Sequence, residues 1–179
     1  MVPFLLVALG CAAEPVEGDT GVTLPASTTH YWHGGSRGHE PDKVSTEVPE
    51  DLWIRRTVDP ATASIVEDLV QGGVWHVAYR VDGDQFSGDF VTDDGTLTVT
   101  GALYGDAWAW DAWGSASTYT DGPYVGMYIT SVDEVRPSGT LVTEKMVYTA
   151  EGVAVWQIDE SSEPTTASEF DAAWAAAGG

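Results

Sequence analysis

The sequence predicts an all-β protein, an up-and-down antiparallel β-barrel of about 8–10 strands with a short C-terminal helix. From about residue 52, apolar and polar residues alternate with period two, and turn-forming residues recur roughly every 8 to 12 positions. Helical periodicity is nearly absent before the last residues. An open meander of this length would expose two strand edges, and closing it into a barrel removes both of them.

Six strands are expected in the first part of the chain, over residues 28–33, 52–58, 64–70, 74–81, 85–91 and 96–104. The Asp-Gly pair at 82–83 predicts a tight hairpin, because a type I′ turn needs positive φ at both central residues. The strand before this turn places Trp75 and Tyr79 on the face opposite to His76. The strand at 96–104 alternates most cleanly, with apolar residues on one face and threonines mostly on the other.

Four more strands are expected over residues 107–119, 124–135, 140–149 and 153–159, separated by turns that contain glycine. Residues 167–177 (ASEFDAAWAAA) then predict a helix. Phe170 and Trp174 lie four positions apart and share one helical face, which we expect to dock against the barrel.

The first eleven residues (MVPFLLVALGC) form a short apolar run that ends at Gly10 and Cys11, the only cysteine. This pattern resembles the signal peptide of bacterial lipoproteins, in which a small residue precedes a cysteine that becomes lipidated. The resemblance implies lipidation of Cys11 and anchoring in the bacterial cell envelope, periplasmic or at the outer surface, with membrane contact only through this lipid. The alternative is an apolar N-terminal strand with a buried thiol.

The expected organisation is a signal peptide with its lipidated cysteine (1–11), a flexible acidic tether (12–29) and a barrel domain (30–179). The tether (AAEPVEGDTGVTLPASTT) is rich in Pro, Gly, Ser and Thr, so it cannot bury enough surface to offset the entropy of ordering. If Cys11 is acylated, the mature domain has no thiol, which excludes disulfides, cysteine nucleophiles and zinc–thiolate sites.

The chain is strongly acidic, with 28 Asp and Glu against 7 Lys and Arg and a formal net charge of −21. The few basic residues are scattered along the sequence. Binding to nucleic acid or to anionic headgroups requires clustered basic side chains that neutralise phosphates. We therefore expect no nucleic-acid partner.

The Trp32-His33-Gly34-Gly35 stretch at the first strand, the run of hairpins and the closing helix resemble the calycin group of lipocalins, fatty-acid-binding proteins and bacterial relatives. Members of this group often begin with a Gly-x-Trp motif, and here His30 stands in place of the glycine. The resemblance covers roughly residues 28–179 and implies a lipocalin-like barrel for a small hydrophobic molecule. Some relatives bind haem through a histidine on a late strand, whereas no histidine follows position 76 here.

Three tryptophans fall within six residues in the stretch GDAWAWDAWGSASTY, residues 105–119. On a regular strand, Trp108 and Trp110 point to one face and Trp113 to the other. The predicted ligand-binding residues are Trp108 and Trp110 together with Trp75 and Tyr79, as walls of a lumen that holds one small apolar or aromatic molecule. The alternative is that the indoles only fill the core.

No cofactor and no metal site are expected. His30 and His33 are three positions apart, which sends them to opposite faces of a strand. Residues 34–40 (GGSRGHE) follow no phosphate-loop pattern and are predicted to form a mobile loop over the barrel mouth. Aspartates in the hairpin turns are explained by turn chemistry.

The favoured function is a lipid-anchored envelope protein that binds a small hydrophobic or aromatic ligand in its lumen without catalysis. One alternative is a lyase, isomerase or hydratase acting on a lipophilic substrate, with His76 or a buried carboxylate as general acid or base. Another is a structural surface protein with a filled core. The direction of His76 and the free volume of the lumen discriminate between these three hypotheses.

Overall fold

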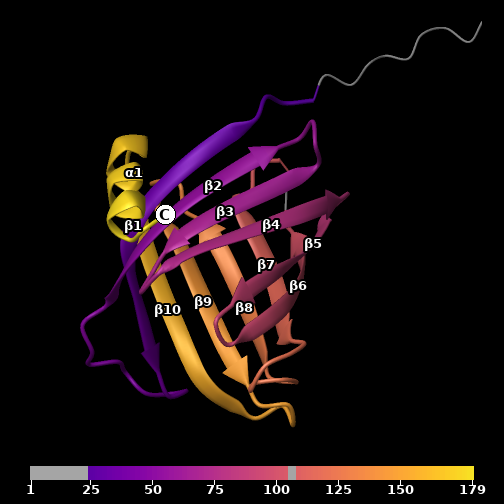
Figure 1. Ribbon diagram of the computed structural model, residues 1–179, viewed down its shortest axis with the longest axis vertical. Coiled ribbons are helices and arrows are strands. Elements are labelled where there is room, and N and C mark those ends of the chain that lie inside the picture. Colours follow the sequence, from indigo (N-terminus) through magenta and orange to yellow (C-terminus); the bar gives the residue numbers. More distant parts are fainter. Residues whose placement is uncertain (1–23, 105–107) are drawn as a thin grey trace, which may run out of the picture.

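Ten antiparallel strands form a closed barrel, and a helix packs on its outer surface (Figure 1). The computed structural model describes residues 24–104 and 108–179. Each strand pairs with its neighbours in chain order, and the first strand also pairs with the last, which closes the sheet. This arrangement confirms the predicted all-β, up-and-down barrel with a C-terminal helix.

The strands are β1 (Thr28–His39), β2 (Glu50–Asp59), β3 (Ser64–Val70), β4 (Val74–Asp82), β5 (Gln85–Thr92), β6 (Gly95–Leu103), β7 (Ala112–Tyr119), β8 (Tyr128–Val135), β9 (Leu141–Tyr148) and β10 (Ala154–Pro164). The helix α1 spans Ala167–Ala176. Among the described residues, no helix is long and apolar enough to cross a membrane. The predicted lipidation site at Cys11 and the tether up to residue 23 lie outside these residues.

Side chains alternate between the lumen and the outer face of the strands, as the period-two pattern predicts. In β4, Val77 and Val81 are buried, while His76, Ala78 and Arg80 at the alternate positions are exposed. In β6, Leu97 and Val99 are buried, and each is followed by an exposed threonine. The apolar core therefore lies inside the barrel.

The predicted mobile loop at residues 34–40 is wrong, because most of this stretch belongs to β1. Residues 34–39 pair with β10, which in turn runs to Pro164 instead of ending at 159. The glycines allow a close approach of the two strands: a Cβ on Gly34 would lie 2.0 Å from the Ser161 carbonyl oxygen, and one on Gly38 would lie 2.2 Å from the Trp156 indole nitrogen. These glycines serve the closure of the barrel and not flexibility.

The helix α1 docks on the outside of β1 and β2, as its apolar face predicts (Figure 1). Thr166 and Glu169 form a capping box at its N-terminus. Phe170 is fully buried, and the Arg55 guanidinium of β2 lies 4.8 Å from the centre of its ring. Trp174 stacks on Phe170 one turn later. The aromatic pair and the arginine thus fix the helix to the sheet.

Replacing Phe170 by alanine removes the fully buried anchor of this helix. We expect Phe170→Ala to lower the free energy of unfolding by about 3–5 kcal/mol, the usual cost of deleting a buried aromatic side chain. Urea denaturation measures the change, with Ala172→Ser at an exposed position of the same helix as control. A loss below about 1 kcal/mol would show that the helix contributes little to the stability of the barrel.

Candidate functional site

The antiparallel connections divide the barrel into two ends. The connections at 60–63, 83–84, 104–111 and 136–140 share one end, which we call the Trp110 end. The connections at 40–49, 71–73, 93–94, 120–127 and 149–153 share the opposite end. Helix α1 follows β10, which also finishes at the Trp110 end.

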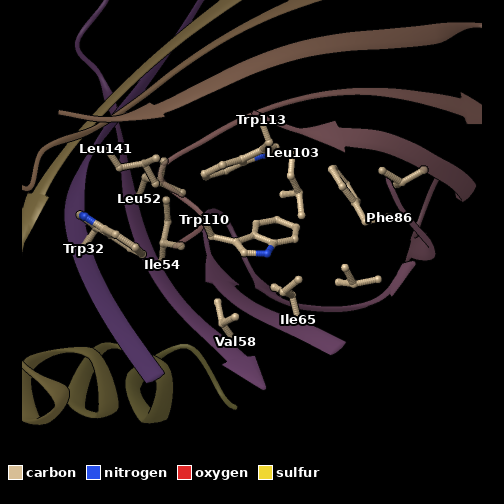
Figure 2. Close-up of a cluster of buried hydrophobic side chains, with 12 residues drawn as sticks. Trp32, Leu52, Ile54, Val58, Ile65, Phe86, Leu103, Trp110, Trp113 and Leu141 are labelled. Atoms are coloured by element: carbon tan, nitrogen blue, oxygen red, sulfur yellow. The ribbon is translucent and has the colours of Figure 1, made fainter. Parts of the chain in front are cut away.

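Trp110 folds into the lumen and fills its end of the barrel. Its backbone φ of 49° turns the chain out of a strand path, so that β7 begins only at Ala112. The predicted strand over 107–119 is therefore confirmed for residues 112–119 only. The prediction that Trp110 and Trp113 point to opposite faces is wrong, because both indoles line the lumen. Both indoles are buried, with ring centres 5.4 Å apart, and Figure 2 shows Trp110 in the middle of the apolar cluster.

A cavity of about 220 Å³ lies in the lumen beyond Trp110. Its lining reaches from Trp110 and Trp113 to Thr92 and Tyr119, which are the last residues of β5 and β7 toward the opposite end. This free volume contradicts the structural hypothesis of a lumen packed solid by side chains.

One wall of the cavity is aromatic and apolar. The rings of Tyr79, Phe86, Trp110 and Trp113 form a continuous series in which each ring centre lies 5.1–5.4 Å from the next. Phe86 sits on Gly101, where a Cβ would come within 2.1 Å of its ring. The aliphatic part of the lining consists of Ile54, Leu69, Val77, Leu97, Val99, Ile129 and Leu141.

The other wall of the cavity carries charge. Arg56 of β2 donates from Nε to Glu67 of the neighbouring β3 at 2.5 Å, and Lys145 of β9 donates to Glu160 of β10 at 2.7 Å. The Tyr79 hydroxyl faces Glu67 at 3.4 Å. Burial and the negative charge of Glu67 raise the pKa of Tyr79 well above its usual value. Burial by itself lowers the pKa of Lys145, but the Glu160 carboxylate outweighs burial and the pKa is raised.

Asp133 is a third carboxyl group on the cavity wall. It projects inward from β8, is 7% exposed, and accepts hydrogen bonds of 2.6 Å from Ser131 and Thr143. Burial raises its pKa, although these hydroxyls and the charges of Lys145 and Arg56 act in the opposite direction. Asp133 is thus the lumenal carboxyl whose hydrogen-bond donors are both neutral hydroxyls.

Arg56 lies where the charged and aromatic walls meet. Its guanidinium centre is 3.8 Å from the centre of the Trp113 ring and 5.9 Å from that of Trp110. The residue is 3% exposed, and its Nη1 has no hydrogen-bond partner among the described residues. Trp110 Nε1 is likewise buried without a partner in this part of the chain.

The structure places two of the four predicted ligand-binding residues in the cavity wall, namely Tyr79 and Trp110. Trp75 packs edge-on against Phe90 and donates to the Gln71 carbonyl, and it does not line the cavity. Trp108 packs against the core from its place before β7 and does not line the cavity either.

The charged wall was not predicted from the sequence, apart from the general possibility of a buried carboxylate. Its members share a simple property: each occupies a position of its strand that alternation assigns to the lumen. They are Arg56, Glu67, Ser115, Ser117, Ser131, Asp133, Thr143, Lys145 and Glu160. Polar residues at inward positions of β7, β8 and β9 are the pattern by which they could have been found.

His76 lies outside the lumen, where its side chain is 63% exposed and forms an ion pair with Asp68 at 2.6 Å. An enzymatic role for His76 on a lumenal substrate is therefore wrong. Within residues 24–104 and 108–179, no group of three or more His, Cys, Asp or Glu side chains is placed to hold a metal ion. Asp111, next to Trp110, is exposed.

No protein-family model matches the sequence, and no curated protein is significantly similar to it. Among solved structures, the chain is similar to a nonspecific heme-binding cyclase that catalyses a [4 + 2] cycloaddition in neoabyssomicin biosynthesis. The two chains are 15% identical with a TM-score of 0.27, over 87% of this chain and 76% of the other. At this TM-score the backbones do not superpose closely, so the activity of that protein does not transfer.

The raised pKa of Asp133 predicts a pH-dependent effect of removing its charge. In the unfolded chain the carboxyl titrates near its ordinary value of about 3.9. The folded state therefore loses stability as pH rises through that value and the higher pKa of the folded chain. We expect the free energy of unfolding of Asp133→Asn to rise relative to that of wild type as the pH increases from about 3.9 through the raised pKa of the folded carboxyl.

Urea unfolding of both proteins at several pH values measures this difference. Asp89→Asn is the matched control, because Asp89 also accepts a threonine hydrogen bond but lies on the exposed outer face. A difference between Asp133→Asn and wild type that stays constant with pH would contradict the prediction.

Proposed function

We propose that the barrel binds one small molecule in its lumen, with an apolar or aromatic body and a polar end. The observation that carries this proposal is the cavity of about 220 Å³ between an aromatic wall and a charged wall. Aromatic rings that line free space leave apolar surface uncovered by protein, and a ring-shaped guest would cover it. The charged wall adds a polar end to the hydrophobic or aromatic ligand that the sequence predicts.

The size of the cavity restricts the guest. Sites for drug-sized molecules usually measure about 300–1,000 Å³. The smaller lumen here favours molecules of one ring with a short substituent over long-chain lipids. An enzymatic role on such a molecule would have to use a lumenal carboxyl such as Asp133, since His76 lies outside.

Filling the lumen tests the proposed site directly. Ser117 points into the cavity from β7, whereas its neighbour Thr118 is exposed on the outer face. We expect Ser117→Phe to abolish binding of a one-ring aromatic probe measured by calorimetry, because the new ring occupies the guest's place. Thr118→Phe adds the same ring outside the barrel and should leave binding unchanged. Equal binding to both variants would place the ligand outside the lumen.

We further propose that the protein is a lipoprotein of the bacterial cell envelope, anchored through Cys11. The support is the apolar run that ends at Gly10 and Cys11 and the Pro- and Gly-rich segment after it, which suits a spacer between membrane and barrel. The N-terminal anchor and the lumenal ligand are independent proposals.

Expression of the full chain in a bacterial host with labelled palmitate tests the anchor. We expect label in the membrane fraction for wild type and none for Cys11→Ser, because the thiol is the acyl acceptor. Gly10→Ala keeps a small residue before the cysteine and serves as the control that retains label. Unlabelled wild-type protein would refute lipidation while leaving the lumenal site unaffected.

A further inference from the structure

The lumenal cations keep N–H donors without a partner in the described part of the chain, whereas every lumenal carboxyl group already accepts hydrogen bonds from the protein. Each of the three lumenal carboxyl groups already accepts two hydrogen bonds. Arg56 and Tyr79 donate to Glu67, Ser131 and Thr143 to Asp133, and Ser36 and Lys145 to Glu160. Each carboxyl group of the charged wall is therefore already bound to donors of the protein itself.

The two lumenal cations have donors to spare. Arg56 donates from Nε to Glu67, and its buried Nη1 has no partner in the described part of the chain. A guanidinium carries five N–H donors and an ammonium three. Lys145 makes its hydrogen bond to Glu160, and 32% of its side-chain surface stays accessible on the lumenal side of β9. Leaving buried donors unpaired is costly, so an acceptor that reaches them is stabilised.

We propose that the polar end of the bound molecule is a hydrogen-bond acceptor, a carbonyl or carboxylate oxygen, held by Lys145 and Arg56 while its ring lies against Phe86 and Trp113. This inference rests on the proposed lumenal binding and names the class of guest. An amine placed at Lys145 and Arg56 would meet their positive charges at short range, which is unfavourable, and the three carboxyl groups would attract it to another part of the wall. A neutral carbonyl adds no charge to the lumen, whereas a carboxylate adds one.

Four probes of matched size test the class of guest by calorimetry on the full chain. They are 4-phenyl-2-butanone, 3-phenylpropionate, 3-phenylpropylamine and propylbenzene. We expect the ketone or the carboxylate to bind at least about tenfold more tightly than propylbenzene, the effect of one hydrogen bond from a charged donor. The amine should bind no better than propylbenzene. An amine that binds as well as the acceptor probes would overturn the assignment and indicate the carboxyl groups as the anchor.

Variants of the cation identify the anchor. We expect Lys145→Met to reduce the affinity for the better acceptor probe about tenfold and to leave propylbenzene binding unchanged. Because this variant leaves Glu160 buried without its cation, the double variant Lys145→Met/Glu160→Gln removes the ion pair as a unit. Arg80→Met, which removes an exposed cation from the outer face of β4, is the control. Unchanged affinity of the acceptor probe in a folded double variant would exclude Lys145 as the anchor.

The two proposals fail in different ways. If none of the four probes binds to wild type, lumenal binding itself is refuted. If propylbenzene binds and the acceptor probes gain nothing over it, the lumen binds ligands but the donors of Arg56 and Lys145 do not recognise them.

Discussion

The pairing of β1 with β10 is the interaction on which the rest of the structure depends. Without it the ten strands would form a sheet with two open edges, and the inward residues would face solvent. The closure is tight because Gly34 and Gly38 have no Cβ that would meet β10. Closure encloses the inward polar residues in a buried hydrogen-bonded network. It therefore forms the cavity and also requires charged side chains to be buried, which is unfavourable.

Burying charged side chains costs desolvation free energy, and ion pairs between cations and carboxylates in the lumen offset part of it. Arg56 lies directly opposite Glu67 on the neighbouring strand, and Lys145 lies diagonally across from Glu160, so the sheet itself holds the partners of each ion pair within reach. The arginine also stacks on Trp113. Arg56 Nη1 is an exception, because it has no hydrogen-bond partner within the described residues. Such exceptions are informative about function, since buried donors are rarely left without acceptors.

Much of the fold could be predicted from the sequence because strand alternation and turn residues are local properties. The inward face of β4 and of β6, the number of strands and the docking of Phe170 all follow from such patterns. The failures at residues 34–40 and at Trp110 have a different cause. In each case a contact between residues far apart in sequence determines the local structure. Pairing with β10 makes a strand of the glycine-rich stretch. Burial of the Trp110 indole in the core is accompanied by a left-handed backbone at that residue.

The candidate site was predicted only in part for the same reason. Tyr79 and Trp110 belong to it, but tryptophan density also pointed to Trp108, which packs elsewhere. Aromatic content marks buried surface without telling a cavity wall from a filled core. The charged wall assembles residues from β2, β3, β7, β8, β9 and β10, and these strands meet only when the barrel closes. The spacing of residues along the sequence does not show which strands meet when the barrel closes, so the charged wall could not be predicted from it.

Arg55 and Arg56 are adjacent in β2, and strand alternation places one on the outer face of the barrel and the other in the lumen. Arg55 faces outward, where it pairs with Asp68 and covers Phe170 of the helix, while Arg56 faces inward to Glu67. In the register of β2 and β3, Arg55 lies opposite Asp68 and Arg56 opposite Glu67. A shift of one residue would send each arginine to the wrong face and break both ion pairs and the helix contact together. The same register of β2 and β3 therefore places Arg56 in the lumen and Arg55 against the helix α1. A substitution that shifts this register would disturb the lumenal ion pair and the helix contact together.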